Sequence, residues 1–210
     1  MSDLALREEI CRTGARLAAR GLSPGTSGNI SVRTESGWIV TPTNASLAAL
    51  DPQRLSRLDE EGRHVDGDPP TKERFLHRAV YEARTDCRAI VHLHSTHAVA
   101  YSCLQGLDAR SAFPPLTPYT VMRLGDVALV AYARPGDERL GELVGDAARD
   151  HHVMLLANHG PVLAGRSLEA ASTAAEELEE SAKLYFLLHG HAIRLLTDAQ
   201  VEELRSAFVS

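Results

Sequence analysis

The chain has 210 residues, of which 44% are hydrophobic and 24% charged, and it carries a formal net charge of −6 with a pI near 5.9. These values are typical of a globular protein with one domain and a good-sized core. The acidic balance excludes the basic footprint of a nucleic-acid-binding protein, so a bound phosphate group must be held by local donors.

The three cysteines, Cys11, Cys87 and Cys103, lack the spacing of a disulfide framework or of a thiolate zinc site. Charged residues interrupt the first twenty positions, which excludes the apolar core of a signal peptide. No apolar run approaches the roughly 20 residues that a membrane-spanning helix needs. We therefore expect reduced thiols, a cytoplasmic location, and no membrane or nucleic-acid partner.

The first predicted element is an amphipathic helix. Leu6, Ile10 and Leu17 share one of its faces, and Gly21 is its expected C-terminal stop. The loop 21–28 contains three glycines, which allow backbone N–H groups to turn toward an anion. Composition alone is more typical of a plain surface turn.

A β-hairpin is predicted next. Residues 30–32 and 38–40 have strand-forming side chains, and the segment between them is typical of a turn. Thr43 and Asn44 lie where the chain leaves the second strand. Residues 50–68 predict further short strands, with a charged turn that faces solvent.

A helix is predicted over 71–84, with Thr71 as its N-cap and Glu73 in its first turn. The free N–H groups of a helix start suit an anion, and here Thr71 adds a hydroxyl and Lys72 a charge. A solvent-exposed lysine is the equally good alternative for Lys72. His77 shares a face with Glu73 at i,i+4 spacing and is interpreted as a supporting or core side chain.

The most informative stretch is Val91-His92-Leu93-His94. In an extended chain the two histidines point to the same face, because strand side chains alternate. Two imidazoles at the carboxyl end of an apolar strand can bind one divalent metal, although ordinary histidines at a strand end are a common alternative. Ser95 is the predicted cap of a helix over 97–104.

The next segments predict structure more than chemistry. A proline-rich loop carries Tyr119, which is interpreted as a core or capping tyrosine or, less often for such a residue, as a catalytic one. A strand is predicted over 127–132 and a helix over 137–149. His151 and His152 face opposite ways in an extended chain, so both are interpreted as structural.

A third candidate ligand follows the apolar run 153–157, at His159 in the turn Asn158-His159-Gly160-Pro161. An imidazole at this second strand end would complete a three-histidine site with an open position. Glu73 is then a fourth ligand, a general acid or base, or only a partner of its helix dipole.

The last predicted elements are two helices. A long helix runs from Ser167 as cap to about His189, and Thr197-Asp198-Ala199-Gln200 is a capping box that opens the final helix. Four glutamates are predicted to form the solvated side of the long helix: Glu176, Glu177, Glu179 and Glu180. His189 and His191 flank a helix-stopping glycine, so they are discounted as ligands.

Taken in order, several of these segments resemble the signature of the class II aldolase and adducin family. They are Gly25-Thr26-Ser27-Gly28-Asn29-Ile30-Ser31, Thr41-Pro42-Thr43, Pro70-Thr71-Lys72-Glu73, His92-Leu93-His94 and Asn158-His159-Gly160. The resemblance implies one α/β domain over 1–210, with a mixed, mostly antiparallel sheet covered by helices on both faces. It also implies a homotetramer with active sites between subunits.

The resemblance assigns roles to site residues as well. It implies one divalent metal, expected to be Zn²⁺, held by His92, His94, His159 and Glu73, with Glu73 as proton donor once substrate displaces it. The substrate phosphate is expected against six residues: Gly28, Asn29, Thr43, Asn44, Thr71 and Lys72. Related aldolases commonly have Gly in place of Asn44 and Ser in place of Thr71 and Lys72. The departure at Lys72 suggests a more anionic substrate here.

Within this family, residues 91–97, 116–119 and 156–161 look closest to the 3-oxo-tetronate 4-phosphate decarboxylases. That likeness implies loss of carbon dioxide from a phosphorylated sugar acid to give dihydroxyacetone phosphate through a metal-bound enediolate, in acid-sugar catabolism. A fuculose-phosphate-type aldolase or a pentulose-phosphate 4-epimerase is the alternative, because an aldolase of this family makes the same enediolate. A non-catalytic adducin-like assembly module is more remote, because all four candidate ligands are present.

Overall fold

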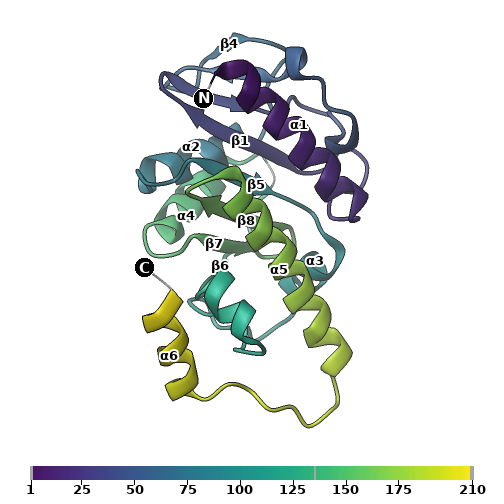
Figure 1. Cartoon of the computed structure of the whole chain (residues 1–210), viewed down its shortest axis with the longest axis vertical. Coiled ribbons are helices and arrows are strands. Elements are labelled where there is room, and N and C mark those ends of the chain that lie inside the picture. The colour runs from purple at the N-terminus through teal and green to yellow at the C-terminus, as the bar shows by residue number, and fades with distance from the viewer. Residues whose placement is uncertain (1, 135, 209–210) are drawn as a thin grey trace.

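One eight-stranded sheet organises the computed structural model, which describes residues 2–134 and 136–208 (Figure 1). Its strand order is β4-β3-β2-β1-β5-β8-β7-β6. The strands are β1 (Asn29–Thr34), β2 (Gly37–Val40), β3 (Ser56–Leu58), β4 (His64–Asp66), β5 (Ala89–His92), β6 (Val127–Val130), β7 (Val153–Leu156) and β8 (Gly160–Gly165). Only β6 and β7 pair in parallel; the other neighbours are antiparallel. The predicted mixed, mostly antiparallel sheet is therefore confirmed.

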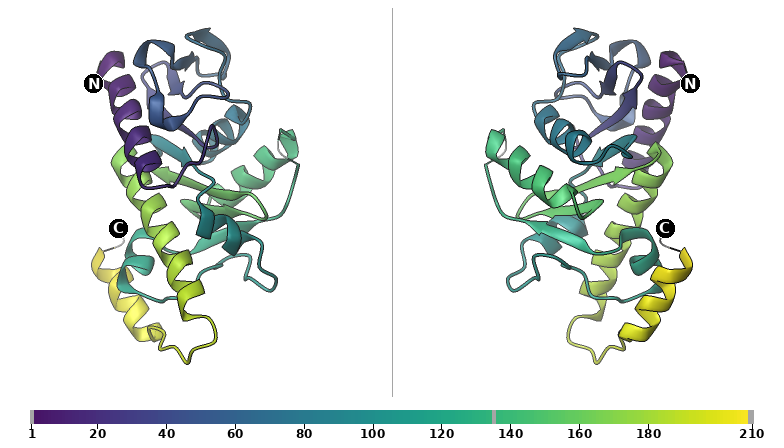
Figure 2. Two further views of the ribbon diagram at one scale, coloured as in Figure 1. Left: turned by 90° about the vertical axis from the view of Figure 1, so that its right-hand side faces the viewer. Right: turned by 90° about the vertical axis from the view of Figure 1, so that its left-hand side faces the viewer.

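Helices cover both faces of the sheet, as the views from either side show (Figure 2). They are α1 (Asp3–Ala19), α2 (Arg74–Ala83), α3 (Thr96–Ser102), α4 (Glu138–Ala148), α5 (Leu168–Leu188) and α6 (Asp198–Phe208), with short 3₁₀ turns at Leu47–Ala49 and Pro52–Arg54 and a π-helical turn at Thr120–Leu124. The core on one face joins α1, α3 and α5 to the sheet, and α2 and α4 share the other. Among the residues described, no helix is long and apolar enough to cross a membrane.

Strands β5 and β7 carry apolar side chains on both faces, up to His92 at the end of β5, and both faces are buried. In β5, Val91 packs into the core under α1 and α5, whereas Ile90 packs against α2. In β7, Leu155 belongs to the same core as Val91, and Met154 belongs to the same core as Ile90. Each fully buried aliphatic side chain contributes about 1.5–3 kcal/mol. This alternation fixes the register of β5, and with it the face on which His92 emerges.

The ends of the first helix follow from its sequence. Ser2 accepts a hydrogen bond from Ala5 N at the start of α1. At its end, Gly21 has φ 77°, and its N–H donates to Ala18 O while Leu22 N–H donates to Leu17 O. This is the Schellman arrangement, which glycine adopts without strain. The predicted stop at Gly21 is confirmed.

The predicted hairpin, the short strands after it and the caps of the last two helices are also confirmed. Residues 29–34 and 37–40 pair as β1 and β2. Ser167 Oγ accepts from Ala170 N at the start of α5. Thr197 and Gln200 exchange the two hydrogen bonds of a capping box before α6.

The helix predicted over 71–84 begins later than expected, at Arg74, so Thr71 is not its N-cap and Glu73 stands at the cap position. The reason is a non-local pairing. Pro42 and Pro70 form a β-bridge, and Thr71 N–H donates to Thr41 O at 3.2 Å. This pairing holds the chain extended through Thr71, whose hydroxyl accepts from Glu73 N instead.

Ser95 stands at the N-cap position of α3 as predicted, but its side chain makes no capping hydrogen bond, because a glutamate from α5 takes that role. The Glu179 carboxylate accepts hydrogen bonds from His97 N and Ala98 N, both at 2.9 Å, and from His97 Nδ1 at 2.7 Å. Burial raises the pKa of Glu179, but these N–H donors outweigh it and hold the pKa below its usual range. Glu179 is 7% exposed, so the prediction that it faces solvent is corrected too.

We expect Glu179→Ala to lower the free energy of unfolding of the metal-free protein by about 1.5–3 kcal/mol, because a helix start loses a charged acceptor. Urea denaturation measures the loss. Glu180→Ala is the matched control, since Glu180 is an exposed neighbour whose Lys183 partner lies 3.8 Å away; its effect should stay within about 0.5 kcal/mol. Equal losses in the two variants would contradict this role of Glu179.

Candidate metal centre

Two adjacent segments of the sheet bring the three predicted histidines together. His92 is the last residue of β5, and His94 follows two positions later. His159 lies in the tight turn between β7 and β8, and β8 is the neighbour of β5. The turn packs closely on the chain near His94, because a Cβ at Gly160 would lie 2.3 Å from Leu93 O. Only glycine permits this approach, which seats His159 beside the other two rings.

Each of the four candidate ligands offers one nitrogen or oxygen atom, and these four atoms lie within 4.8 Å of one another. Glu73 Oε2 lies 3.4 Å from His92 Nε2, and Glu73 Oε1 lies 3.3 Å from His159 Nε2. His92 Nε2 and His94 Nε2 are 3.1 Å apart. Ligands at about 2.1 Å from one tetrahedral zinc ion would lie roughly 3.3–3.4 Å from each other. The spacing therefore fits a single small cation.

The tautomer of His92 suits this role. Its Nδ1–H donates to the backbone oxygen of Pro161 at 2.8 Å, so the lone pair of Nε2 faces the cluster. Metal-binding histidines are commonly oriented by such a bond from the other ring nitrogen. Nitrogen lone pairs that converge within hydrogen-bonding distance repel one another unless a proton or a cation lies between them.

Electrostatics in the metal-free cluster point the same way. Burial raises the pKa of Glu73, but positive charge at His92 and hydrogen bonds from His159, His92 and Asn29 hold it well below its usual range. Burial lowers the pKa of His92, and the Glu73 carboxylate more than compensates. Burial and the neighbouring His92 and His159 lower the pKa of His94 to about 4. An ionised carboxylate beside three imidazoles, of which His94 loses its proton readily, is the donor set of a divalent cation.

The Glu73 carboxylate has a second partner on β1. Asn29 Nδ2 donates to Glu73 Oε2 at 2.8 Å, and Asn29 Oδ1 accepts from His77 Nε2. Burial lowers the pKa of His77 to about 3, so this ring is neutral. This position agrees with the interpretation of His77 as a supporting side chain. Asn29 is expected at the phosphate, but its amide group is hydrogen-bonded to Glu73.

The segments predicted to bind phosphate meet beside this cluster. Gly28 has φ 78°, and a Cβ there would lie 2.9 Å from His92 O. Thr41 N–H donates to Ile30 O, and Thr43 N–H donates to Pro69 O. Segments 28–30, 41–44 and 69–73 are thus joined by backbone hydrogen bonds next to Glu73.

Two residues of these segments have further properties that bear on phosphate binding. Asn44 adopts φ 58°, a left-handed conformation that Asn tolerates and Gly favours. The Lys72 side chain is exposed, and within the described chain it forms no ion pair.

The remaining candidates lie outside the cluster. Tyr119 is 59% exposed and immediately precedes the π-helical turn. His151 and His152 bond to backbone oxygens of Arg110 and Arg123, in keeping with structural roles. His191 is exposed after α5.

Sequence reasoning missed two side chains that support the cluster, Ser31 and Tyr81. Ser31 Oγ lies 2.7 Å from His77 Nδ1 and 2.8 Å from Tyr81 Oη. A signal for them was present: Asn29 and Ser31 alternate on one strand, and His77 and Tyr81 repeat the helical spacing from Glu73.

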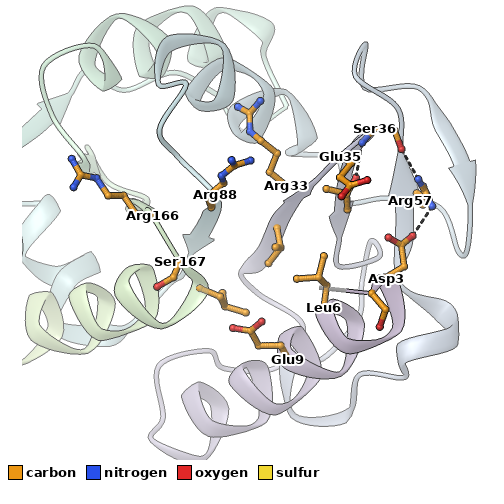
Figure 3. Close-up of a pocket in the computed structure, with 14 residues that line it drawn as sticks. Asp3, Leu6, Glu9, Arg33, Glu35, Ser36, Arg57, Arg88, Arg166 and Ser167 are labelled. Atoms are coloured by element: carbon orange, nitrogen blue, oxygen red, sulfur yellow. Dashed lines mark hydrogen bonds and ion pairs between the residues drawn. The ribbon is translucent and has the colours of Figure 1, made fainter.

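A cavity of about 570 Å³ lies at the other end of β1 and is separate from this centre (Figure 3). None of the four candidate ligands lines it. Arg57 on its wall bonds to Asp3 and to Ser36, as the dashed lines in Figure 3 show. The positive charge of Arg57 is thus partly neutralised by Asp3.

Comparisons with known proteins agree with this geometry. Residues 8–186 match the Class II Aldolase and Adducin N-terminal domain. The 3-oxo-tetronate 4-phosphate decarboxylase of Escherichia coli K12 is 48% identical, over 98% of this chain and all of its own. The L-fuculose phosphate aldolase of the same strain is 34% identical, over 86% and 82%. The crystal structure of YgbL from Klebsiella pneumoniae has a TM-score of 0.95 at 48% identity, over 98% of this chain and 100% of that one.

Proposed function

The chain belongs to the class II aldolase and adducin family, and within it we propose that it is a metal-dependent 3-oxo-tetronate 4-phosphate decarboxylase. The observation that carries the proposal is the convergence of Glu73, His92, His94 and His159 within 4.8 Å. Five relatives with this activity in their names support the choice of reaction, at 44–48% identity over 97–99% of this chain.

The reaction balances simply. Carbon 1 of the substrate is the carboxylate, carbon 2 carries a hydroxyl group, carbon 3 is the ketone, and carbon 4 carries the phosphate. The bond between carbons 1 and 2 breaks, carbon dioxide leaves, and the electron pair stays with carbons 2 and 3 and the ketone oxygen. One proton added to carbon 2 gives dihydroxyacetone phosphate.

His92, His94, His159 and Glu73 would hold one divalent cation, and we propose Zn²⁺ because imidazole nitrogens and a carboxylate suit it. When bound, the cation supplies Lewis acidity where negative charge develops on the ketone oxygen. The Pro161 carbonyl keeps His92 Nε2 free to act as a ligand.

Glu73 is the proposed proton donor to carbon 2. Burial favours its neutral form, and contact with His92 and His159 favours its carboxylate. A substrate that separates Glu73 from these rings leaves burial as the main influence and raises its pKa. Glu73 then takes a proton from solvent, gives it to carbon 2 and returns to the carboxylate. We keep Tyr119 as the second candidate for this role.

We propose that the phosphate lies against the segments that meet beside Glu73. Six residues make up this site: Gly28, Asn29, Thr43, Asn44, Thr71 and Lys72. Among these six, Lys72 alone carries a positive charge, and its exposed side chain is free to reach an anion.

We expect Lys72→Met to raise KM about tenfold to a hundredfold with little change in kcat, because it removes one charge-assisted bond of about 1.5–3 kcal/mol. Steady-state kinetics on the 4-phosphate substrate give both constants. Arg78→Met is the matched control, since Arg78 is a nearby exposed cation, in α2, that pairs with Glu82. An unchanged KM in Lys72→Met would remove Lys72 from the phosphate site.

One assay tests the proposed reaction. Purified, zinc-loaded protein is supplied with 3-oxo-tetronate 4-phosphates, and release of carbon dioxide is measured beside aldehyde-dependent condensation of dihydroxyacetone phosphate. Carbon dioxide release is the expected result. Condensation without decarboxylation would establish the aldolase alternative, which the 34% identity to an L-fuculose phosphate aldolase favours next. Protein that takes up no zinc and is inactive in both assays would fit the adducin-like alternative.

We also propose a cytoplasmic homotetramer with active sites between subunits. Exposed apolar side chains on the outer segments support an assembly, and Leu187 and Phe208 are 64% and 63% exposed in the single chain. Sedimentation velocity at assay concentration measures the state directly.

A further inference from the structure

Two elements face each other behind the metal centre, and each carries polar residues at its own period. On α2 and its N-cap, Glu73, His77 and Tyr81 are four residues apart and share one helix face. On β1, Asn29 and Ser31 are two apart and share one strand face. The two rows interdigitate into a single line of hydrogen bonds.

The line is continuous and buried. Tyr81 Oη lies 2.8 Å from Ser31 Oγ, and Ser31 Oγ lies 2.7 Å from His77 Nδ1. His77 Nε2 then meets Asn29 Oδ1, and Asn29 Nδ2 lies 2.8 Å from Glu73 Oε2. None of the four residues behind Glu73 is more than 6% exposed. The Trp38 ring lies nearly parallel to the His77 ring, with the ring centres 6.2 Å apart.

The donors can be ordered from one end. The Glu73 carboxylate can only accept, so Asn29 must present its NH₂ group to Glu73 and its carbonyl oxygen to His77. His77 Nε2 therefore carries the hydrogen, and in a neutral ring Nδ1 must accept from Ser31. The Ser31 hydroxyl has then donated, so Tyr81 donates to it. Each donor points toward Glu73, and such aligned bonds polarise one another.

We propose that Tyr81, Ser31, His77 and Asn29 form a directed positioning chain that fixes Glu73 Oε2, and so holds the carboxylate in place beside His92 and His159. The proposal rests on the metal centre proposed above. His77 is its key member, because its Nε2–H holds the carbonyl oxygen of Asn29 and so keeps the NH₂ group on the carboxylate. A flipped amide would place Oδ1 against Oε2, oxygen against oxygen, and push Glu73 out of place.

The experiment measures the affinity of full-length, metal-free protein for Zn²⁺ by competition with a chromogenic chelator. His77→Leu should weaken binding about tenfold to a hundredfold, the usual cost of losing a residue that orients a metal ligand. His77→Gln, which can donate to Asn29 and accept from Ser31, should recover most of that loss. Circular dichroism at the assay temperature confirms that each variant is folded.

A double-mutant cycle separates positioning from general structural damage. Glu73→Ala removes the ligand that the chain acts on, and the three histidines still bind metal. Adding His77→Leu to Glu73→Ala should then leave the affinity for Zn²⁺ unchanged within about twofold. Losses that multiply in full would overturn the proposal, because His77 would be acting on something other than Glu73.

The far end of the chain offers the mildest variant, in case His77→Leu does not fold. Tyr81→Phe deletes one buried hydroxyl, and Tyr101→Phe deletes another, whose bond to Ala112 O is unconnected to Glu73. Tyr81→Phe should weaken Zn²⁺ binding and Tyr101→Phe should not; equal affinities would count against the chain. Wild-type protein that binds no Zn²⁺ would instead refute the metal centre itself, so the two failures are distinguishable.

Discussion

Replacing His159 with alanine should give a folded protein that holds little metal and has lost almost all turnover. Two imidazoles and one carboxylate would remain, and they bind a divalent cation much less tightly than four ligands do. Without the cation, several kcal/mol of charge stabilisation on the ketone oxygen are lost, which corresponds to roughly a thousandfold or more in kcat. His92→Ala and His94→Ala should behave in the same way.

Elemental analysis of the dialysed variants, beside turnover and circular dichroism, checks this prediction. His191→Ala is the matched control, because His191 belongs to a second His-x-His pair that the structure leaves exposed at the end of α5. It should keep wild-type metal content and turnover. Full metal occupancy in His159→Ala would refute the three-histidine site.

Glu73→Gln should separate metal binding from proton transfer. The amide keeps the shape of the carboxylate and can still accept from Asn29, so with three histidines in place most of the metal should remain. An amide cannot deliver a proton, however. We expect kcat to fall by roughly 10²–10⁴, the usual value of a positioned general acid, while solvent slowly protonates carbon 2.

Metal content and kcat at saturating substrate must be measured on the same preparation of Glu73→Gln. Normal turnover with normal metal would place the acid elsewhere. Tyr119→Phe is then the next variant, and a fall of similar size in that variant would assign the role to the exposed tyrosine.

Local patterns explain how much of this site the sequence predicts. His92 and His94 belong together because they are two residues apart at the end of an apolar strand, and that is a property of the strand alone. The alternation that fixes their face is equally local. That His159 and Glu73 join them depends on how β5, β8 and α2 are arranged; local patterns offered both only as candidates, and the likeness to a known family brought them together.

The errors share one physical cause, which is that contacts between distant segments override local signals. Glu179 has the sequence environment of a solvated glutamate, and only the packing of α5 on α3 places it at a helix start. Thr71 has the features of an N-cap, yet its pairing with Thr41 moves the cap position two residues on, to Glu73. The sequence predicts that Asn29 lies near the site, but it does not reveal that the Asn29 amide is hydrogen-bonded to Glu73.

The separation of the four ligands along the chain also bears on folding kinetics. Glu73 and His159 are 159 − 73 = 86 positions apart, and His159 reaches the others only after β5 and β8 have paired. Such distant contacts form late in folding, because the entropy cost of closing a long loop comes before the favourable contact energy is gained. A cation that binds only the finished arrangement stabilises the native state more than the folding transition state. Bound metal should therefore prolong the lifetime of the folded chain while leaving the rate at which it folds almost unchanged.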